Sequence, residues 1–553
     1  MKNCFKGINQ VRLLIPLLIA VVFGVSCKKF LEASPKDVVL ESNFPKNYWD
    51  AEFMLRGAYQ AMQPLVEYKF VLGEVPGDWV QPGSGADSNI VELSYHRVTP
   101  GNRYTDWQPF YDLINRANYV IKNVPRVPLD SNYFSATRRD QYIGEARFLR
   151  SWAYFHLVEN FGAVPLIWDA VDDISKVDTL FKIPPSSENI VLDSLEADLQ
   201  KAYNTTDIQI WVPNSFDAGL RVSVEQTNLR VRKQAVCGLQ AEVYLWRNKY
   251  TQAAAACQAF YNTGIDINTY NNNTGWMGIF SFGPTSLYNE PIFRVNFSFA
   301  ARELNSLMML TSNDPASGGR YMIAPSLAAI KTYNPYYPDS LSSSNLRGEL
   351  YRGFGNSYAG SAPFYNRLKS GAPVIWKFIG LGTVTAATVD VPANVRAPYQ
   401  SDYVPHIYRQ GDLYLLWAEA LNRMGDKTTA IARLNTIRGR AGMPAANTAS
   451  PVYDSVTTSS STEKIENFIL RERAMELGFE GRRWYDLMRV ARHQGSPSSP
   501  NINVVVNAVA NRLARQGLPA DQQAAVTARL ADPKNWYLPY NAAQVKLNPY
   551  LVK

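Results

Sequence analysis

The sequence of 553 residues predicts a mainly α-helical protein built from four helix pairs, with one large irregular, loop-rich insertion. Two similar stretches predict the pairs, because each has the pattern of a helix, a tight turn and a second helix. Between residues 264 and 410 the helical periodicity fades, and Gly, Pro, Asn, Ser and aromatic residues dominate. The composition, 46% hydrophobic and 19% charged, is that of a folded globular chain.

The N-terminal segment has the parts of a secretory signal peptide. Three basic residues precede an apolar run that is shorter than the roughly 20 residues of a membrane span. Cys27 follows the small residues 24–26, an arrangement that resembles a bacterial lipobox. We therefore expect residues 1–26 to be removed and Cys27 to carry acyl chains that anchor the mature chain, residues 27–553. An ordinary signal peptide with an incidental cysteine is the alternative.

The net charge argues against nucleic acid as a partner. The whole chain carries +8, and the signal segment holds Lys2, Lys6 and Arg12 without an acidic residue, so the mature chain carries +5. That value is small for this length and no basic run stands out, so nucleic-acid binding is not favoured.

Apolar periodicity places the helices of each pair along the chain. The first pair falls within 48–124, the second within 141–203, the third within 231–262 and the fourth within 412–440. The two helices of the first pair, 48–65 and 104–124, are separated by a stretch rich in Gly, Pro, Asp and Ser. A loop of that length inside a domain is usually functional or disordered. After Arg492 the sequence is again irregular.

An internal repeat supports the third and fourth pairs. The segment LQAEVYLWRNKYTQAAAAC begins at Leu239, and LWAEALNRMGDKTTAIARL begins at Leu416. Aligned without gaps, they match Ala241 with Ala418, Glu242 with Glu419 and Ala253 with Ala430. The small residues resemble those of tetratricopeptide units, in which they let paired helices approach closely and stack into one continuous core.

Residues 463–489 are the stretch around which the rest of the chain is organised. Their apolar spacing predicts one long helix across the stack of pairs. Aromatic and charged side chains share the same turns, which favours a packed helix whose carboxylates pair with arginines three and four residues away.

Its later part, ERAMELGFEGRRWYDLMR, resembles the C-terminal signature of the SusD/RagB family, cell-surface nutrient-binding lipoproteins of Bacteroidota. The matching residues are Glu472, Arg473, Glu476, Leu477, Phe479, Glu480, Gly481, Arg483, Trp484, Asp486, Leu487 and Arg489. A second block, residues 145–166, resembles the family's E-A-R-F-L-R…F-G-x-V-P-L pattern. The resemblance implies a SusD-like fold, an outer-membrane location, a nutrient ligand and a SusC-like TonB-dependent transporter as partner.

The sequence offers little for catalysis. His96, His156, His406 and His493 show no metal-ligand spacing, and no nucleophile elbow or phosphate loop occurs. We therefore expect neither enzyme activity nor a cofactor or metal. Glu472, Glu476 and Glu480 could imitate the carboxylate pair of a glycosidase, but nearby arginines favour an ion-paired scaffold.

Two cysteines remain after lipidation of Cys27. Cys237 and Cys257 lie about symmetrically around the turn of the third pair, so an antiparallel hairpin brings them close. Two small buried thiols are the favoured interpretation, and a disulfide is the alternative.

Tryptophans in loop-like sequence give the candidate ligand site. Asp78 and Trp79 stand among Gly and Pro, and Asn273 and Trp276 stand in an Asn-rich stretch of the insertion. An indole can cover the apolar face of a sugar while amides and carboxylates bond its hydroxyls. The bland alternative, hydrophobic anchors for loops, is equally consistent with each residue. No ligand residue transfers from the family, since it shares no motif there.

These observations predict an outer-membrane, cell-surface lipoprotein that binds a nutrient, an oligosaccharide in the favoured hypothesis, and delivers it to a SusC-like transporter. Three alternatives stay open: a peptide-binding, RagB-like member of the family, a secreted glycosidase, and a tetratricopeptide adaptor that binds only protein.

Overall fold

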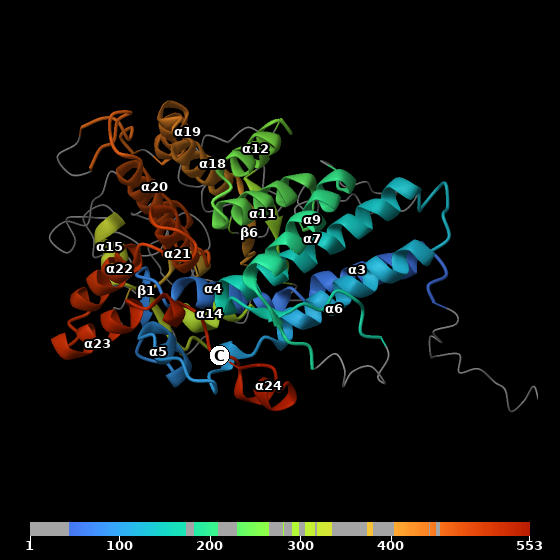
Figure 1. Cartoon of the computed structure of the whole chain (residues 1–553), viewed down its shortest axis with the longest axis horizontal. Helices are drawn as coiled ribbons and strands as arrows, with labels where there is room; N and C mark the ends of the chain where they lie inside the picture. Colours follow the sequence, from blue (N-terminus) through green and yellow to red (C-terminus); the bar gives the residue numbers. More distant parts are fainter. Residues whose placement is uncertain are drawn as a thin grey trace, which may run out of the picture. The chain divides into compact units, whose positions relative to one another are not determined.

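The computed structural model confirms the mainly helical fold (Figure 1). The described residues are 44–172, 182–207, 229–264, 280, 290–297, 303, 305–313, 315, 318–333, 373–379, 403–441, 443–449 and 454–552. Residues 47–553 form one compact unit. Among the described helices, none is both long and apolar enough to cross a membrane.

Four helix pairs form the framework, as expected. They are α3 (Tyr48–Gln60) with α6 (Gln108–Asn123), α7 (Ala136–Phe161) with α9 (Glu188–Thr205), α11 (Lys233–Trp246) with α12 (Tyr250–Tyr261), and α18 (Gln410–Met424) with α19 (Lys427–Arg440). Successive pairs pack on one another through α6 and α7, α9 and α11, and α12 and α18. The pairs therefore stack in chain order, which buries a continuous core.

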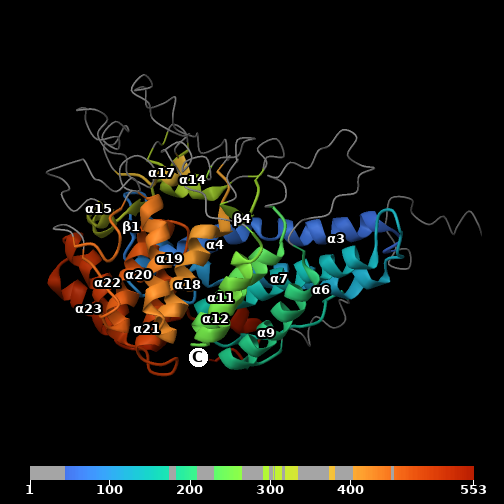
Figure 2. The same cartoon turned by 90° about the horizontal axis from the view of Figure 1, so that it is seen from above.

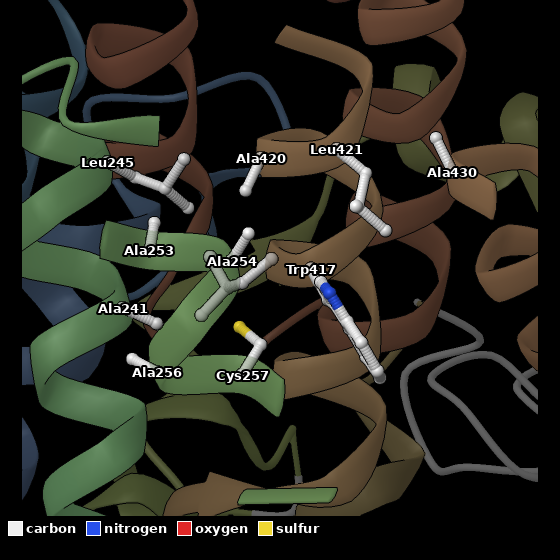
Figure 3. Close-up of a cluster of buried hydrophobic side chains, with 11 residues drawn as sticks. Ala241, Leu245, Ala253, Ala254, Ala256, Cys257, Trp417, Ala420, Leu421 and Ala430 are labelled. Atoms are coloured by element: carbon white, nitrogen blue, oxygen red, sulfur yellow. The ribbon is translucent and has the colours of Figure 1, made fainter. Parts of the chain in front are cut away.

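The two repeated segments meet face to face in this stack. A buried cluster at the contact of α12 with α18 contains Ala253, Cys257, Trp417, Ala420 and Leu421 (Figure 3). Alanines on both helices remove side-chain bulk, so the backbones approach closely and Trp417 fills the remaining space. Cys237 and Cys257 are both buried and free, which confirms the thiol interpretation.

The first pair differs from its prediction. Its first helix ends at Gln60, and a separate helix, α4 (Gln63–Glu74), begins within the predicted helix 48–65 and extends into the expected loop. Pro64 lies in the first turn of α4, where its missing N–H costs no intrahelical hydrogen bond. Most of α4 is buried all round, so its sequence lacks the amphipathic period that marks a surface helix. The connection also holds β1 (Val80–Pro82), α5 (Ser88–Ser94) and a short 3₁₀ turn.

The described part of the insertion is made of short elements. They are β4 (Pro291–Arg294), α14 (Ser306–Thr311), β5 (Ile323–Pro325), α15 (Leu327–Tyr333) and α17 (Trp376–Ile379), followed by β6 (His406–Arg409). Two-stranded antiparallel sheets join β5 to β1 and β4 to β6. Since α14 contacts α4 and β5 pairs with β1, the insertion is attached to the N-terminal half, and Figure 2 shows α14, α15 and α17 along one side of the stack. A third sheet pairs β2 (Val164–Pro165) with β3 (Pro185–Ser186).

The signature segment is two helices, where one was expected. α20 (Thr462–Leu477) and α21 (Arg483–Gln494) are separated by residues 478–482. Phe479 and Gly481 have φ values of 70° and 75°, which end a right-handed helix. A Cβ on Gly478 would lie 2.3 Å from the Trp79 indole nitrogen, so close packing requires glycine here.

The C-terminal region is also more regular than the sequence indicated. It contains α22 (Ile502–Arg515), α23 (Ala520–Leu530), a 3₁₀ turn (Pro533–Trp536) and α24 (Ala542–Leu547). α22 packs on α21, α23 and α15. Few residues of these helices are buried, so their apolar spacing was too sparse to predict them.

Candidate functional site

A buried ionic network surrounds the link between α20 and α21. At its centre, Arg409 donates to Glu480 at 2.9 Å from Nε, and to Glu476 and Glu290 at 2.8 Å from Nη1. All four side chains are almost fully buried. An arginine fork suits this position because its five N–H donors satisfy several carboxylates at once.

Further cations complete the network from other elements. Arg440 bonds Glu290 and Glu476 at 2.7 and 2.8 Å, and the Lys377 ammonium lies 2.7 Å from Glu480. Glu472 pairs with Arg438 at 2.7 Å. The expected pairing at three- and four-residue spacing is therefore largely wrong, since the partners come from α17, β6 and α19. Within the segment, the Asp486 carboxylate forms ion pairs with Arg489, three residues away, and with Arg473.

The same segment holds both repeats. Arg482 pairs with Glu242 of α11, and Arg489 pairs with Glu419 of α18 at 2.7 Å. Glu242 and Glu419 are the carboxylates that the gapless repeat alignment superimposes. Each repeat thus presents one buried acid, and the α20–α21 segment neutralises each with its own arginine.

Electrostatics show that these groups are committed to one another. Burial raises the pKa of the Glu480 carboxyl, but the charges of Arg409 and Lys377 outweigh burial and leave that pKa well below its usual range. Burial likewise opposes ionisation of Asp486, yet Arg473 and Arg489 lower its pKa to about 2. The carboxylates Glu472, Glu476 and Glu480 are thus ion-paired scaffold, as the sequence analysis favoured, and not a glycosidase pair.

Asp78 and Trp79 lie in this packed interior. Asp78 accepts from Arg483 at 2.6 and 2.9 Å, and Trp79 is 2% exposed. The Trp79 ring meets Tyr333 edge to face, and the backbone of both residues fixes the start of α15 through Ser326. This geometry is that of a loop anchor, the structural alternative for both residues. Asp78 and Trp79 are buried because the connection between α4 and β1 packs inward against residues 478–482.

Three other predicted site residues lie outside the described residues. They are Asn273 and Trp276, predicted to bind ligand, and Cys27, predicted to be lipidated. Their roles stay predictions. The partners Glu290, Arg409, Arg440 and Asp412 were not singled out from sequence, although charges embedded in the apolar run around Arg409 are a signal that could have found them.

His493 occupies a structural position. His493 approaches Glu466 at 3.0 Å and Glu419 at 3.3 Å through Nδ1, and its Nε2 donates to the Leu245 carbonyl at 2.8 Å. The three side chains could together ligate a cation. However, Arg489 already bonds Glu419 and Arg423 already bonds Glu466, so arginines supply the positive charge.

One of the described cavities, of about 570 Å³, lies between α6 and the C-terminal tail. Trp107, Tyr111 and several aliphatic residues line it. Its polar groups are mostly used internally: Tyr111 donates to the Pro165 carbonyl at 2.6 Å, and Gln544 donates to Asp106 at 2.7 Å. The cavity is therefore mainly apolar, with few polar atoms left for a polar ligand.

The scaffold is a stack of helix pairs that the buried ionic network holds together. Two family models match the chain in order: residues 29–261 match "Starch-binding associating with outer membrane", and residues 365–553 match the SusD family. A SusD-like protein of Formosa agariphila is 27% identical over 525 residues, which cover 88% of this chain and 92% of that protein. A SusD-like protein of Bacteroides ovatus is 25% identical over 525 residues, covering 87% and 83%.

Solved structures share the fold. A SusD superfamily protein from Bacteroides vulgatus has a TM-score of 0.68 at 17% identity, covering 91% of this chain and 98% of its own. A laminarin-binding SusD-like protein has a TM-score of 0.61 at 22% identity, with the same coverage. The chain belongs to the SusD/RagB family, a family of non-catalytic binding proteins. It is accordingly an outer-membrane-associated member of a carbohydrate-binding family, and not an enzyme.

Proposed function

We propose that the chain is a lipid-anchored protein of the cell surface that binds an oligosaccharide and delivers it to a SusC-like TonB-dependent transporter. The observation that carries the proposal is the match to SusD-type proteins along nearly the whole chain, including one whose description is laminarin binding. A carrier must bind without turnover, and the carboxylates of the signature segment, such as Glu472 and Glu476, are paired with arginines. The signature network acts as a clamp that fixes the helix pairs under the insertion.

Binding is tested with the purified mature chain and a panel of oligosaccharides that includes laminarin fragments. Calorimetric titration should give saturable binding to at least one saccharide, and prolonged incubation should release no new reducing ends. If the chain binds peptides and no saccharide, the proposed ligand class changes from saccharide to peptide. Release of reducing ends by the chain would contradict the carrier role.

The ligand face is proposed to lie in the insertion, with Asn273 and Trp276 among its contacts. Trp276→Ala should then weaken saccharide binding by about 1–3 kcal/mol, the general value for burying such a side chain. Trp79→Ala is the matched comparison, because its buried indole should contribute to stability and not to affinity. Unchanged affinity in Trp276→Ala removes that residue from the site without affecting the proposed carrier role.

The anchor and the partner have separate tests. Cys27→Ala should move the protein from the membrane fraction to the soluble fraction in cells that lack the transporter, because the acyl chains provide the attachment. Affinity purification of the wild-type chain from membranes should recover a TonB-dependent transporter. Retention of the Cys27→Ala chain in washed membranes would contradict lipid anchoring.

A further inference from the structure

A cavity of about 770 Å³ is bordered by the ends of α4, α7 and α23, the start of α21 and the C-terminal tail. We refer to it as the basic cavity, because the charged residues that line it are Arg97, Arg529 and Lys534, and no lining residue carries a carboxylate. Its volume is within the range of roughly 300–1,000 Å³ that ligand pockets occupy.

The three cations are available. The Arg97 guanidinium lies 5.7 Å from the centre of the Tyr95 ring and interacts electrostatically with Glu92. The Glu92 carboxylate accepts its hydrogen bonds from Thr99 and Asn102. In the described chain, the side-chain nitrogens of Arg97, Arg529 and Lys534 have no ion-pair partner within 4.0 Å. The buried arginines around the signature are mostly paired with carboxylates, whereas these three exposed cations line the cavity without such a partner among the described residues.

Behind the cavity wall lies a further positive charge. Arg512 is fully buried and bonds Ser94 Oγ at 2.6 Å and the carbonyl of Val80 at 3.3 Å. No carboxylate of the described residues lies within ion-pair distance of it. The field reaches the cavity: burial, together with the charges of Arg512 and Arg529, lowers the pKa of the lining residue His96 to about 3. His96 is therefore neutral, and the two charges that help to keep it so, those of Arg512 and Arg529, are positive.

Aromatic and amide groups accompany the cations. Trp484, Trp536 and Tyr537 line the cavity with Asn160 and Asn535. Trp536 is fixed by a hydrogen bond from its indole nitrogen to the Leu530 carbonyl at 2.9 Å, and Tyr537 is only partly buried. An apolar ring beside unpaired cations suits a ligand with both a C–H face and an acidic group.

We propose that the basic cavity binds an anionic saccharide, carboxylated or sulfated, whose acidic group pairs with Arg97, Arg529 and Lys534. The proposal rests on the carrier role above. It narrows the ligand to one with an acidic group, and it adds a subsite for that group to the contacts proposed for Asn273 and Trp276. Charge-assisted hydrogen bonds from arginine and lysine to carboxylate or sulfate oxygens are stronger than neutral ones, so acidic units gain affinity that neutral units lack.

The test compares two double variants with the same change in net charge. Arg529→Gln with Lys534→Gln removes two cavity cations, and Arg515→Gln with Lys546→Gln removes two exposed cations that do not line the cavity. Both chains and the wild type are titrated with a uronic-acid oligosaccharide, a sulfated oligosaccharide and a neutral oligosaccharide of the same length. Melting curves check that both variants fold, which is expected since the replaced side chains are exposed.

The cavity variant should lose roughly tenfold or more in affinity for an acidic saccharide, while its affinity for the neutral one stays the same. The control variant should match the wild type. Loss for only the uronate or only the sulfated saccharide identifies which acidic group is bound.

Equal affinity of the cavity variant and the wild type for every acidic saccharide would overturn the inference. So would equal losses in both variants, which indicate a general charge effect, or binding of neutral saccharides only. In each of these cases the carrier role survives. Absence of any saccharide binding by the wild type would instead contradict the proposed function itself.

Discussion

Two buried regions hold the helix pairs together by opposite means. The contact of α12 with α18 is built from Ala253, Cys257, Ala420 and Leu421 around Trp417, with apolar atoms on both sides. The contacts of the α20–α21 segment with β6, α11, α18 and α19 are built from arginines and carboxylates, most of them less than 5% exposed. Both regions exclude water, but the first is held by close packing of apolar side chains and the second by buried ion pairs.

The difference shows what each type of contact can specify. An apolar contact tolerates changes that conserve volume, because dispersion and burial carry no direction. A buried ion pair gives little net stability, yet removal of one partner leaves an uncompensated charge. The ionic region therefore fixes which elements meet: Arg409 of β6, Arg482 and Arg489 each have distinct acidic partners.

The largest expected effect comes from breaking the ionic region at its centre. Arg409→Met should lower the free energy of unfolding by about 3–5 kcal/mol, because Glu476 and Glu480 lose a buried partner. Urea unfolding at neutral pH measures the change. The control Arg116→Met breaks an exposed pair with Asp112 and should cost less than about 1 kcal/mol. Equal effects of the two variants would mean that burial adds nothing to the pairing.

A cavity in the apolar region should have a somewhat smaller effect. Leu245→Ala is expected to cost about 3 kcal/mol, since a fully buried leucine leaves a space that the neighbouring alanines cannot fill. Unlike the loss in Arg409→Met, this loss should not change with salt or with pH between 5 and 8. Leu547→Ala, at a residue 58% exposed, is the control and should stay within about 0.5 kcal/mol. A strong salt dependence in Leu245→Ala would contradict the division between the two regions.

Backbone geometry at the ionic link gives a third test. Gly481 has φ of 75°, and a Cβ there would lie 2.5 Å from the Lys69 carbonyl oxygen. Gly481→Ala should therefore cost about 1–3 kcal/mol from strain, and the close contact adds to this value. Gly517→Ala is the control with a similar φ but open surroundings, so any excess in Gly481→Ala reports the contact. Similar losses in both would show that the link can relax.

The last test concerns pH dependence, for which the expected change is smallest when it is counted per pH unit. Glu74 accepts from the N–H groups of Gly481 and Arg482, but burial raises its pKa to about 8 from 4.5. Between these values the folded chain holds a proton that the unfolded chain has released. The free energy of unfolding contributed by this group is therefore full below pH 4.5 and falls as pH rises toward 8.

Glu74→Gln should remove this contribution and flatten the decline by up to about 1.4 kcal/mol for each pH unit between 5 and 8, which is the value of one proton. Part of the decline in the free energy of unfolding should remain in Glu74→Gln, because burial also raises the pKa of Glu159 to about 8. Denaturant unfolding at pH 5, 6, 7 and 8 measures it, with the exposed Asp112→Asn as control. A decline as steep as that of the wild type would show that Glu74 is ionised in the folded chain.

The sequence determined the parts of this protein that depend on neighbours along the chain. Helical period located the four pairs, the repeat at Leu239 and Leu416 identified the paired units, and the ordered signature from Glu472 to Arg489 identified the family. It also indicated that Glu472, Glu476 and Glu480 are ion-paired. These conclusions hold because period, spacing and residue order are local properties that a single chain displays directly.

Only the tertiary structure decided which groups meet. The α20 acids Glu472 and Glu476 pair with arginines 34 to 67 positions away. The helix breaks at 478–482, where Lys69 and Trp79 pack closely, and the predicted ligand residues Asp78 and Trp79 are buried. Arg97, Arg529 and Lys534, far apart in sequence, border one cavity. Composition cannot show this, because whether a loop indole is an anchor or a platform, and whether a cation is paired or free, depends on the packing of distant segments.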